Sequence, residues 1–125
     1  MKAKKITDFV GNTPLIEVSN ILNKKGVRLF LKLEGHNPGG SVKDRAAYNM
    51  IFEALNRRNI KKGDHLVEAT SGNTGIALAF ISKVLGLHMT LVMPESATEE
   101  RVKTMKAYGA EVLLTPKEEG IEGAR

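Results

Sequence analysis

The sequence predicts an α/β fold, a parallel sheet with crossover helices. Segments rich in strand-forming residues alternate with segments of helical periodicity, an order typical of parallel strands joined by helices. The chain has 125 residues, of which 42% are hydrophobic and 26% charged, as in a globular domain with its own core. In such sheets ligands bind at the carboxyl ends of the strands, so the loops that follow strands are the first candidates for a functional site.

The N-terminal segment contains two predicted strands. The run GNTP at 11–14 has the composition of a turn, and a short strand is predicted directly after it at 15–18. A second strand is predicted at 27–34, which is rich in strand formers although it alternates only in part. Because helices and strands alternate after it, it is predicted to be the first strand of the parallel sheet. A loop follows at 36–41, because Asn-Pro-Gly-Gly interrupts regular structure.

Helices and strands alternate in the rest of the chain. Apolar residues recur at helical spacing from Val42 onward, and Ser41 has a side chain suited to cap this helix. Gly86 and Gly109 end the next two predicted helices. The predicted helices cover 42 to 56–59, 76–86 and 99–108, the predicted strands cover 65–69, 87–93 and 110–114, and 117–125 is a loop leading into a helix.

Composition excludes several kinds of site. The chain has no cysteine, which removes disulfides, thiolate nucleophiles and cysteine-ligated zinc. The histidines His36, His65 and His88 lack metal-ligand spacing, so we expect no metal site. No apolar run reaches the roughly 18 residues of a membrane span, so we expect no membrane partner. The N-terminus lacks the apolar region of a secretory signal, which favours a cytoplasmic protein.

The chain is basic, with a formal net charge of +5. A basic balance suits either nucleic acid or anionic small molecules. The basic residues occur in short dispersed groups, aromatic residues make up 5%, and no nucleic-acid-binding motif is present. We therefore interpret the charge as an ordinary solvated surface and expect no nucleic-acid partner.

Lys43 is distinguished by its position. It follows the glycine-containing loop NPGGSV at 37–42 and opens a predicted helix. Glycines let the backbone approach a ligand closely, and a lysine amine can form a Schiff base with a carbonyl-bearing cofactor. Taken alone, one lysine is more often an ordinary surface residue. Asp44 and Arg45 are most simply interpreted as a structural pair at the helix start.

A second loop, TSGNTG at 70–75, also lies where a strand gives way to a helix. Consecutive backbone N–H groups at a helix start bind carboxylate or phosphate. The hydroxyls of Thr70, Ser71 and Thr74 add donors to such a cradle. The amide of Asn73 can hydrogen bond to a phenolate or carboxylate oxygen. The simpler interpretation is a helix entry capped by hydroxyls, and the loop is neither a GxGxxG motif nor a P-loop.

Taken together, the segments GNTPL, NPGGSVKDRAA and EATSGNTGIALA resemble the fold-type-II pyridoxal-phosphate enzymes. The resemblance is to the group that contains cysteine synthase (O-acetylserine sulfhydrylase) and cystathionine β-synthase. It continues through MPESATEERVKTMKAYGAEV and EGIEGAR and so covers essentially the whole chain. The later part is most similar to the B-type cysteine synthases.

This resemblance implies a role for each matching residue. Lys43 matches the lysine that holds pyridoxal 5'-phosphate as a Schiff base and exchanges the Cα proton of the substrate. Asn73 matches the asparagine that hydrogen bonds to the 3′ oxygen of the cofactor. The positions that match the loop closing on the substrate carboxylate are Thr70, Ser71, Gly72 and Thr74.

The reaction implied by the resemblance is β-replacement in cysteine biosynthesis, a branch of amino-acid biosynthesis. O-acetylserine exchanges its leaving group for sulfide or thiosulfate to give cysteine, and the full-length enzyme is a homodimer. Serine or threonine dehydration, cystathionine formation and an inactive truncated module stay open as alternatives.

The resemblance also implies that the chain is the N-terminal part of a longer two-domain fold. In the family, the loop for the cofactor phosphate and the residue facing the pyridine nitrogen come later than position 125. Residues 1–40, approximately, would begin the larger domain, and 41–125 would form the smaller, movable domain. We therefore expect the 125 residues alone to bind the cofactor weakly and to turn over poorly.

Overall fold

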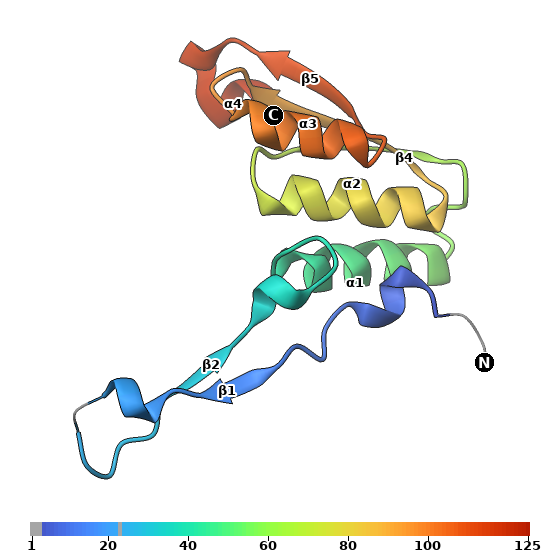
Figure 1. Cartoon of the computed structure of the whole chain (residues 1–125). Coiled ribbons are helices and arrows are strands. Elements are labelled where there is room, and N and C mark those ends of the chain that lie inside the picture. The colour runs from blue at the N-terminus through green and yellow to red at the C-terminus, as the bar shows by residue number, and fades with distance from the viewer. Residues whose placement is uncertain (1–3, 23) are drawn as a thin grey trace.

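A computed structural model of the chain describes residues 4–22 and 24–125 (Figure 1). In chain order the strands and α-helices are β1 (Leu15–Glu17), β2 (Phe30–Lys32), α1 (Lys43–Asn56), β3 (His65–Ala69), α2 (Asn73–Leu85), β4 (His88–Pro94), α3 (Glu99–Ala107), β5 (Glu111–Thr115) and α4 (Gly120–Ala124). Short 3-10 turns lie at Ile6–Phe9, Ser19–Ile21, Glu34–His36 and Lys117–Glu119.

The strands β3, β4 and β5 form a parallel sheet in that order. Helix α2 joins β3 to β4 and α3 joins β4 to β5, because parallel neighbours need a crossover connection. The register places His65 opposite His88 and Thr90 opposite Glu111. In Figure 1, β4 and β5 run toward the side on which α1, α2 and α3 begin. The predicted α/β fold is thus confirmed, with strand ends and helix starts along one edge.

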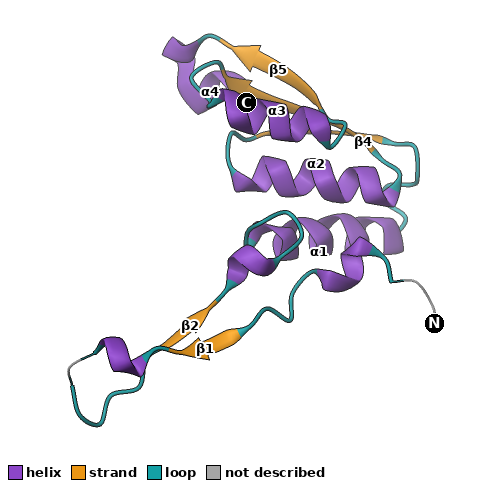
Figure 2. Cartoon of the chain, viewed as in Figure 1, coloured by secondary structure: helices purple, strands orange, loops and turns teal. Residues whose placement is uncertain are grey.

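The first two strands lie outside this sheet, so the prediction for residues 27–34 is wrong in part. Only Phe30–Lys32 is strand there, and it pairs antiparallel with β1, with Leu15 opposite Lys32. The two segments are near neighbours in the chain, which permits antiparallel pairing without a crossover helix. Both strands are exposed, and the ribbon projects away from the helices (Figure 2).

The core lies where α2 meets the sheet. Met89, Leu91 and Met93 alternate along β4, and each is no more than 5% exposed. They share one apolar cluster with the buried run 77–81 of α2. Helix α2 contacts α1, α3 and β4, which explains why it is apolar around most of its circumference. Gly86 then ends the helix in the left-handed region at φ 78°, as the sequence predicts.

Candidate functional site

The two loops identified in the sequence lie at the same end of the molecule. Lys43 is the first residue of α1, and Asn73 is the first residue of α2. The two helices pack against each other and run in the same direction in Figure 1, so their first turns share one end. This end is also the carboxyl edge of the parallel sheet, where α/β proteins bind ligands.

The Lys43 side chain is exposed, whereas its backbone is held by the preceding loop. Its N–H group donates to the Ser41 Oγ atom at 3.2 Å. Ser41 thus makes the capping bond predicted for it, although Val42, which has a helical conformation and no side-chain cap bond, stands between Ser41 and the first residue of α1. The Ser41 hydroxyl satisfies one of the N–H groups that a helix start leaves without a partner.

The start of α2 has no side-chain cap, which contradicts the simpler interpretation of this loop as a helix entry capped by hydroxyls. Gly72 occupies the cap position in an extended conformation, with φ −116° and ψ −157°. First-turn N–H groups without a cap are available to an anionic ligand, and the helix dipole favours negative charge there. The preceding strand end is fixed, because the Thr70 N–H donates to the Val92 carbonyl on β4 at 3.0 Å.

The predicted site residues do not all line the same cleft. Asn73 lines a cleft of about 380 Å³, which it forms with residues of α3 and with Thr98, the residue that precedes α3. The other residues of this cleft are Ile76, Glu100, Arg101 and Thr104. Thr74 instead lines a more apolar cleft of about 300 Å³, which Met50 of α1 and Val67 of β3 also line. Thr70, Ser71 and Gly72 are half-buried between β3 and α2.

A polar network that the sequence analysis missed connects the GNTP turn to α1. Arg45 donates from Nε to Oε2 of Glu34 at 2.8 Å and from Nη2 to Oε1 at 2.9 Å. The same Nη2 reaches Thr13 Oγ1 at 3.1 Å, and Thr13 donates to Glu34 Oε1 at 2.6 Å. The Arg45 guanidinium, together with the Thr13 hydroxyl, lowers the pKa of Glu34 to about 2. Glu34 in turn raises the pKa of Arg45.

Asn37 extends this network into the loop that precedes Lys43. Its side chain is almost fully buried, with its Oδ1 accepting from the Gly11 N–H at 2.8 Å. Its Nδ2 donates to the Glu34 carbonyl at 2.8 Å. From the sequence, Asn37 is predicted only to form the loop and Arg45 only to lie at a helix start. Both polar side chains lie in the motif segment NPGGSVKDRAA, which was the available signal, but a motif does not reveal which partners they meet.

Two of the histidines lie at the opposite edge of the sheet. His65 and His88 are the first residues of β3 and β4, at the amino ends of the strands. A ring nitrogen of His65, Nε2, lies 2.7 Å from Thr90 Oγ1, which donates to Glu111 Oε2 at 3.1 Å. Within residues 4–22 and 24–125, no group of three His, Asp or Glu side chains is arranged to hold a metal ion. None of the helices described has the length and apolar character needed to cross a membrane.

Comparison with known proteins identifies the family. Residues 6–125 match the family described as "Pyridoxal-phosphate dependent enzyme". The chain belongs to this family. It is 56% identical over 116 residues to cysteine synthase B of Escherichia coli (strain K12), across 93% of this chain and 38% of that protein. Cysteine synthase B of Pseudomonas syringae pv. syringae is 52% identical over 120 residues, which make up 96% of this chain and 71% of that protein.

Solved structures agree with this assignment. The cysteine synthase of Entamoeba histolytica matches with a TM-score of 0.93 and 40% identity, over 99% of this chain and 38% of that one. The cystathionine beta-synthase of Bacillus anthracis matches with a TM-score of 0.79 and 41% identity, over 99% of this chain and 47% of that one. The resemblance and fold class stated from the sequence are therefore confirmed, and the chain spans less than half of each of these two proteins.

The residues at the carboxyl edge fit pyridoxal phosphate in their chemistry. Lys43 offers an exposed primary amine, the group that reacts with the aldehyde of the cofactor. The uncapped first turn of α2 offers N–H groups to an anion. Asn73 offers an amide at the rim of a cleft. The donor set thus combines one nucleophile with neutral donors, as a site for an anionic carbonyl compound requires.

Proposed function

We propose that these residues belong to a pyridoxal-phosphate-dependent cysteine synthase, a transferase. It would replace the acetate group of O-acetylserine by sulfide to give cysteine, or by thiosulfate to give S-sulfocysteine, with acetate leaving in both cases. The observation that carries the proposal is the common edge at which α1 begins with Lys43 and α2 begins with Asn73. Identity above 50% to cysteine synthase B over most of the chain supports the choice of reaction within the family.

Lys43 would hold the cofactor covalently through Nζ and serve as the catalytic acid and base. When bound, pyridoxal phosphate stabilises the electron pair left on the substrate Cα after a proton is removed. The Lys43 amine would take that proton and return it. Asn73 would donate its amide hydrogen bond to a cofactor oxygen, which fixes the orientation of the ring.

The loop before α2 would bind the carboxylate of the substrate. Thr70 would supply its hydroxyl there, and Ser71, Gly72 and Thr74 would supply backbone N–H groups together with the hydroxyls of Ser71 and Thr74. The absence of a side-chain cap on α2 supports this role, because the first-turn donors need no displacement of a protein partner. The bond from the Thr70 N–H to the Val92 carbonyl supports it too, since it anchors the loop to the central strand.

We also propose the domain organisation that the sequence analysis expects. Residues 1–40, approximately, would start the larger domain, and 41–125 would form the smaller, movable domain. The separation of the β1–β2 ribbon from the parallel sheet supports a boundary near the start of α1. Full length, the protein would be a cytoplasmic homodimer acting on small molecules, without a nucleic-acid or membrane partner.

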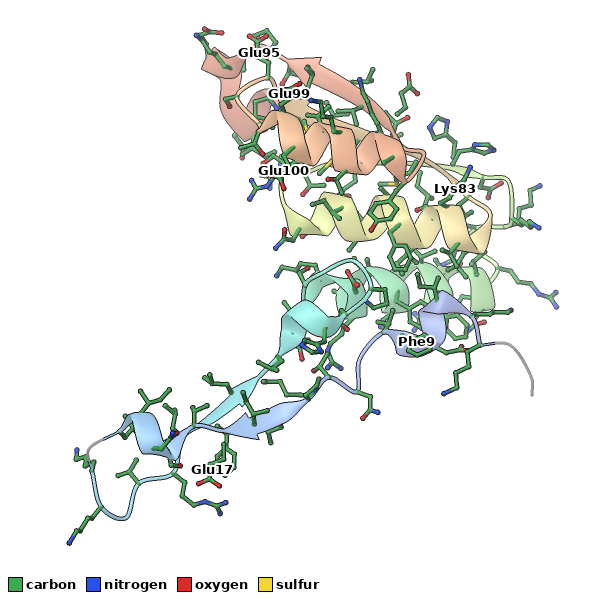
Figure 3. All side chains as sticks on the ribbon, in the orientation of Figure 1. Phe9, Glu17, Lys83, Glu95, Glu99 and Glu100 are labelled. Atoms are coloured by element: carbon green, nitrogen blue, oxygen red, sulfur yellow. The ribbon has the colours of Figure 1, made fainter. Side chains whose placement is uncertain are left out.

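Borohydride trapping tests this function directly. The full-length polypeptide is incubated with pyridoxal phosphate, reduced, digested and mapped, and cysteine formation from O-acetylserine and sulfide is assayed in parallel. We expect the reduced adduct on Lys43 and loss of both signals in Lys43→Arg. Lys83→Arg is the matched control, because this exposed lysine lies near the far end of α2 (Figure 3). Adducts scattered over many lysines, or cysteine formation that survives in Lys43→Arg, would refute the proposal.

Cystathionine formation is the second candidate, because the chain also matches the cystathionine beta-synthase of Bacillus anthracis at 41% identity. The two functions differ in the nucleophile that replaces the leaving group. Supplying sulfide and homocysteine together and quantifying cysteine and cystathionine separates them. A cystathionine rate well above the cysteine rate would reverse the order of the two proposals.

A further inference from the structure

Asp44, the residue next to Lys43, is a buried acid that the proposed reaction does not use. Its side chain is 0% exposed. Its Oδ2 accepts from the Gly39 N–H at 2.5 Å, whereas its Oδ1 has no partner within the described residues. Burial raises the pKa of Asp44, and the Gly39 hydrogen bond opposes that shift. A buried oxygen without a partner destabilises a fold, so stability alone does not explain an acid here.

The contact between Asp44 and Gly39 requires a glycine. A Cβ atom on Gly39 would lie 2.5 Å from Asp44 Oδ1 and 3.0 Å from its Cγ, closer than side chains pack. On its other side the loop closes on itself, because the Gly40 N–H donates to the Asn37 carbonyl at 2.8 Å. Gly40 has φ 85°, which favours glycine at this turn as well. The loop is therefore held between its own turn and the Asp44 carboxyl.

This contact fixes the backbone on both sides of Lys43. Gly39 precedes Lys43 in the loop, and Asp44 follows it directly in α1. Between them, the Asp44 N–H donates to the Ser41 carbonyl at 3.3 Å. One residue further on, Arg45 is bonded to Glu34 by two hydrogen bonds. The Lys43 side chain is thus exposed, while the backbone that aims it is held by buried or half-buried partners.

We propose that Asp44 is a positioning residue: through the Gly39 N–H it fixes the loop at 37–42 and so sets the direction in which Lys43 presents its amine. The proposal rests on the proposed function of Lys43. The contact needs an acceptor oxygen at the Asp44 position, and an asparagine supplies one without the charge. Asp44→Asn should therefore preserve the position of the loop, and Asp44→Ala should release it.

Hydrogen exchange and borohydride trapping test this role in the full-length protein. In the cofactor-free protein, we expect Asp44→Ala to accelerate amide exchange across 37–42. With pyridoxal phosphate, it should lower kcat by about 100-fold, the loss that a displacement of about 1 Å causes, with a much smaller change in KM. It should also shift reduced adducts from Lys43 to other lysines. Asp44→Asn should stay within about threefold of the native protein in each readout, because the acceptor is retained.

Two glycine variants keep the test decisive if Asp44→Ala does not fold. Gly39→Ala disturbs the contact from the loop side and should accelerate exchange across 37–42 while Asp44 is intact. Gly35→Ala is the matched control, because the nearest atom to its added Cβ is the Gly40 carbonyl oxygen at 4.0 Å. The proposal would be overturned if amide exchange across 37–42 stayed as slow in Gly39→Ala as in the native protein. It would also be overturned if Asp44→Asn folded but lost as much kcat and Lys43 labelling as Asp44→Ala.

The exchange experiment also separates this inference from the function proposed above. It needs neither cofactor nor substrate, so it reports on the contact between Asp44 and Gly39 alone. Failure of the native protein to form an adduct on Lys43 would refute the assignment of Lys43. Native exchange at 37–42 in both Asp44→Ala and Gly39→Ala would refute the positioning role of Asp44 even if Lys43 is labelled.

Discussion

Truncation of Leu91 to alanine should destabilise the fold more than any change on the surface of the sheet. Leu91 is 0% exposed and lies on β4, the central strand, with β3 and β5 on either side. It belongs to an apolar cluster built from α1, α2, α3 and β4, whose side chains cannot collapse into the space without moving these elements. Lost burial and the residual cavity together cost about 3 to 4 kcal/mol at such a site.

Leu114→Ala is the matched control for this prediction. Leu114 lies on the neighbouring strand β5 and is 54% exposed. Much of its apolar surface is already in water, and water fills the space that truncation leaves. We therefore expect a loss below about 1 kcal/mol, since exposed positions contribute little.

Urea unfolding followed by far-ultraviolet circular dichroism measures both variants. With a slope near 1.5 to 2 kcal/mol/M, a loss of about 3 to 4 kcal/mol lowers the midpoint by roughly 2 M. Cysteine formation should fall in the Leu91 variant at urea concentrations that leave the control active, because the adjacent Val92 carbonyl anchors Thr70. Equal midpoint shifts in the two variants would contradict the placement of Leu91 in a closely packed core.

Three further outcomes follow from described contacts. Because the pKa of Glu34 is lowered from 4.5 to about 2, its ion pair stabilises the fold above pH 4.5 and loses that contribution as pH falls toward 2; in a melting series over this range, Glu34→Gln should flatten the pH dependence. Arg45→Lys should lower the melting temperature at neutral pH, since one ammonium cannot replace the two-bond contact with Glu34. An unchanged melting temperature would show that this contact does not stabilise the fold. Gly75→Ala should raise the KM for O-acetylserine and change the melting temperature only slightly. The added Cβ would lie 2.9 Å from Met105 Cε and 3.0 Å from Thr70 Cγ2, so Thr70 would have to shift. An unchanged KM would argue against a substrate role for Thr70.

The sequence predicted the elements whose patterns are local. The predicted strand at 65–69 coincides with β3, and α2 ends directly before Gly86, where the apolar run stops. The strand predicted at 27–34 had the right composition, but composition does not encode a partner, and β2 pairs with β1 instead of joining the parallel sheet. The partner of a strand depends on the connection between the two segments, and a short connection without a helix favours an antiparallel neighbour.

The candidate site was predictable to a similar extent. Lys43 and the loop at 70–75 were identified because glycine-containing loops before helices are visible in the sequence, although their binding roles remain predictions. The network around Arg45 was missed, because its bond to Thr13 joins residues 32 positions apart and has no periodic signature. The free Oδ1 of Asp44 was equally invisible, since burial of a polar atom depends on the packed loop that covers it.

The common edge at which the helices begin has a consequence for how fast ligands arrive. Each helix start carries a partial positive charge, but α3 opens with Glu99 and Glu100, which compensate it locally (Figure 3). The first turn of α2 contains no acidic residue. An anion diffusing toward this edge therefore meets a stronger attraction over α2 than over α3. Its encounter rate should be set by this asymmetry, and added salt should slow association by screening the attraction.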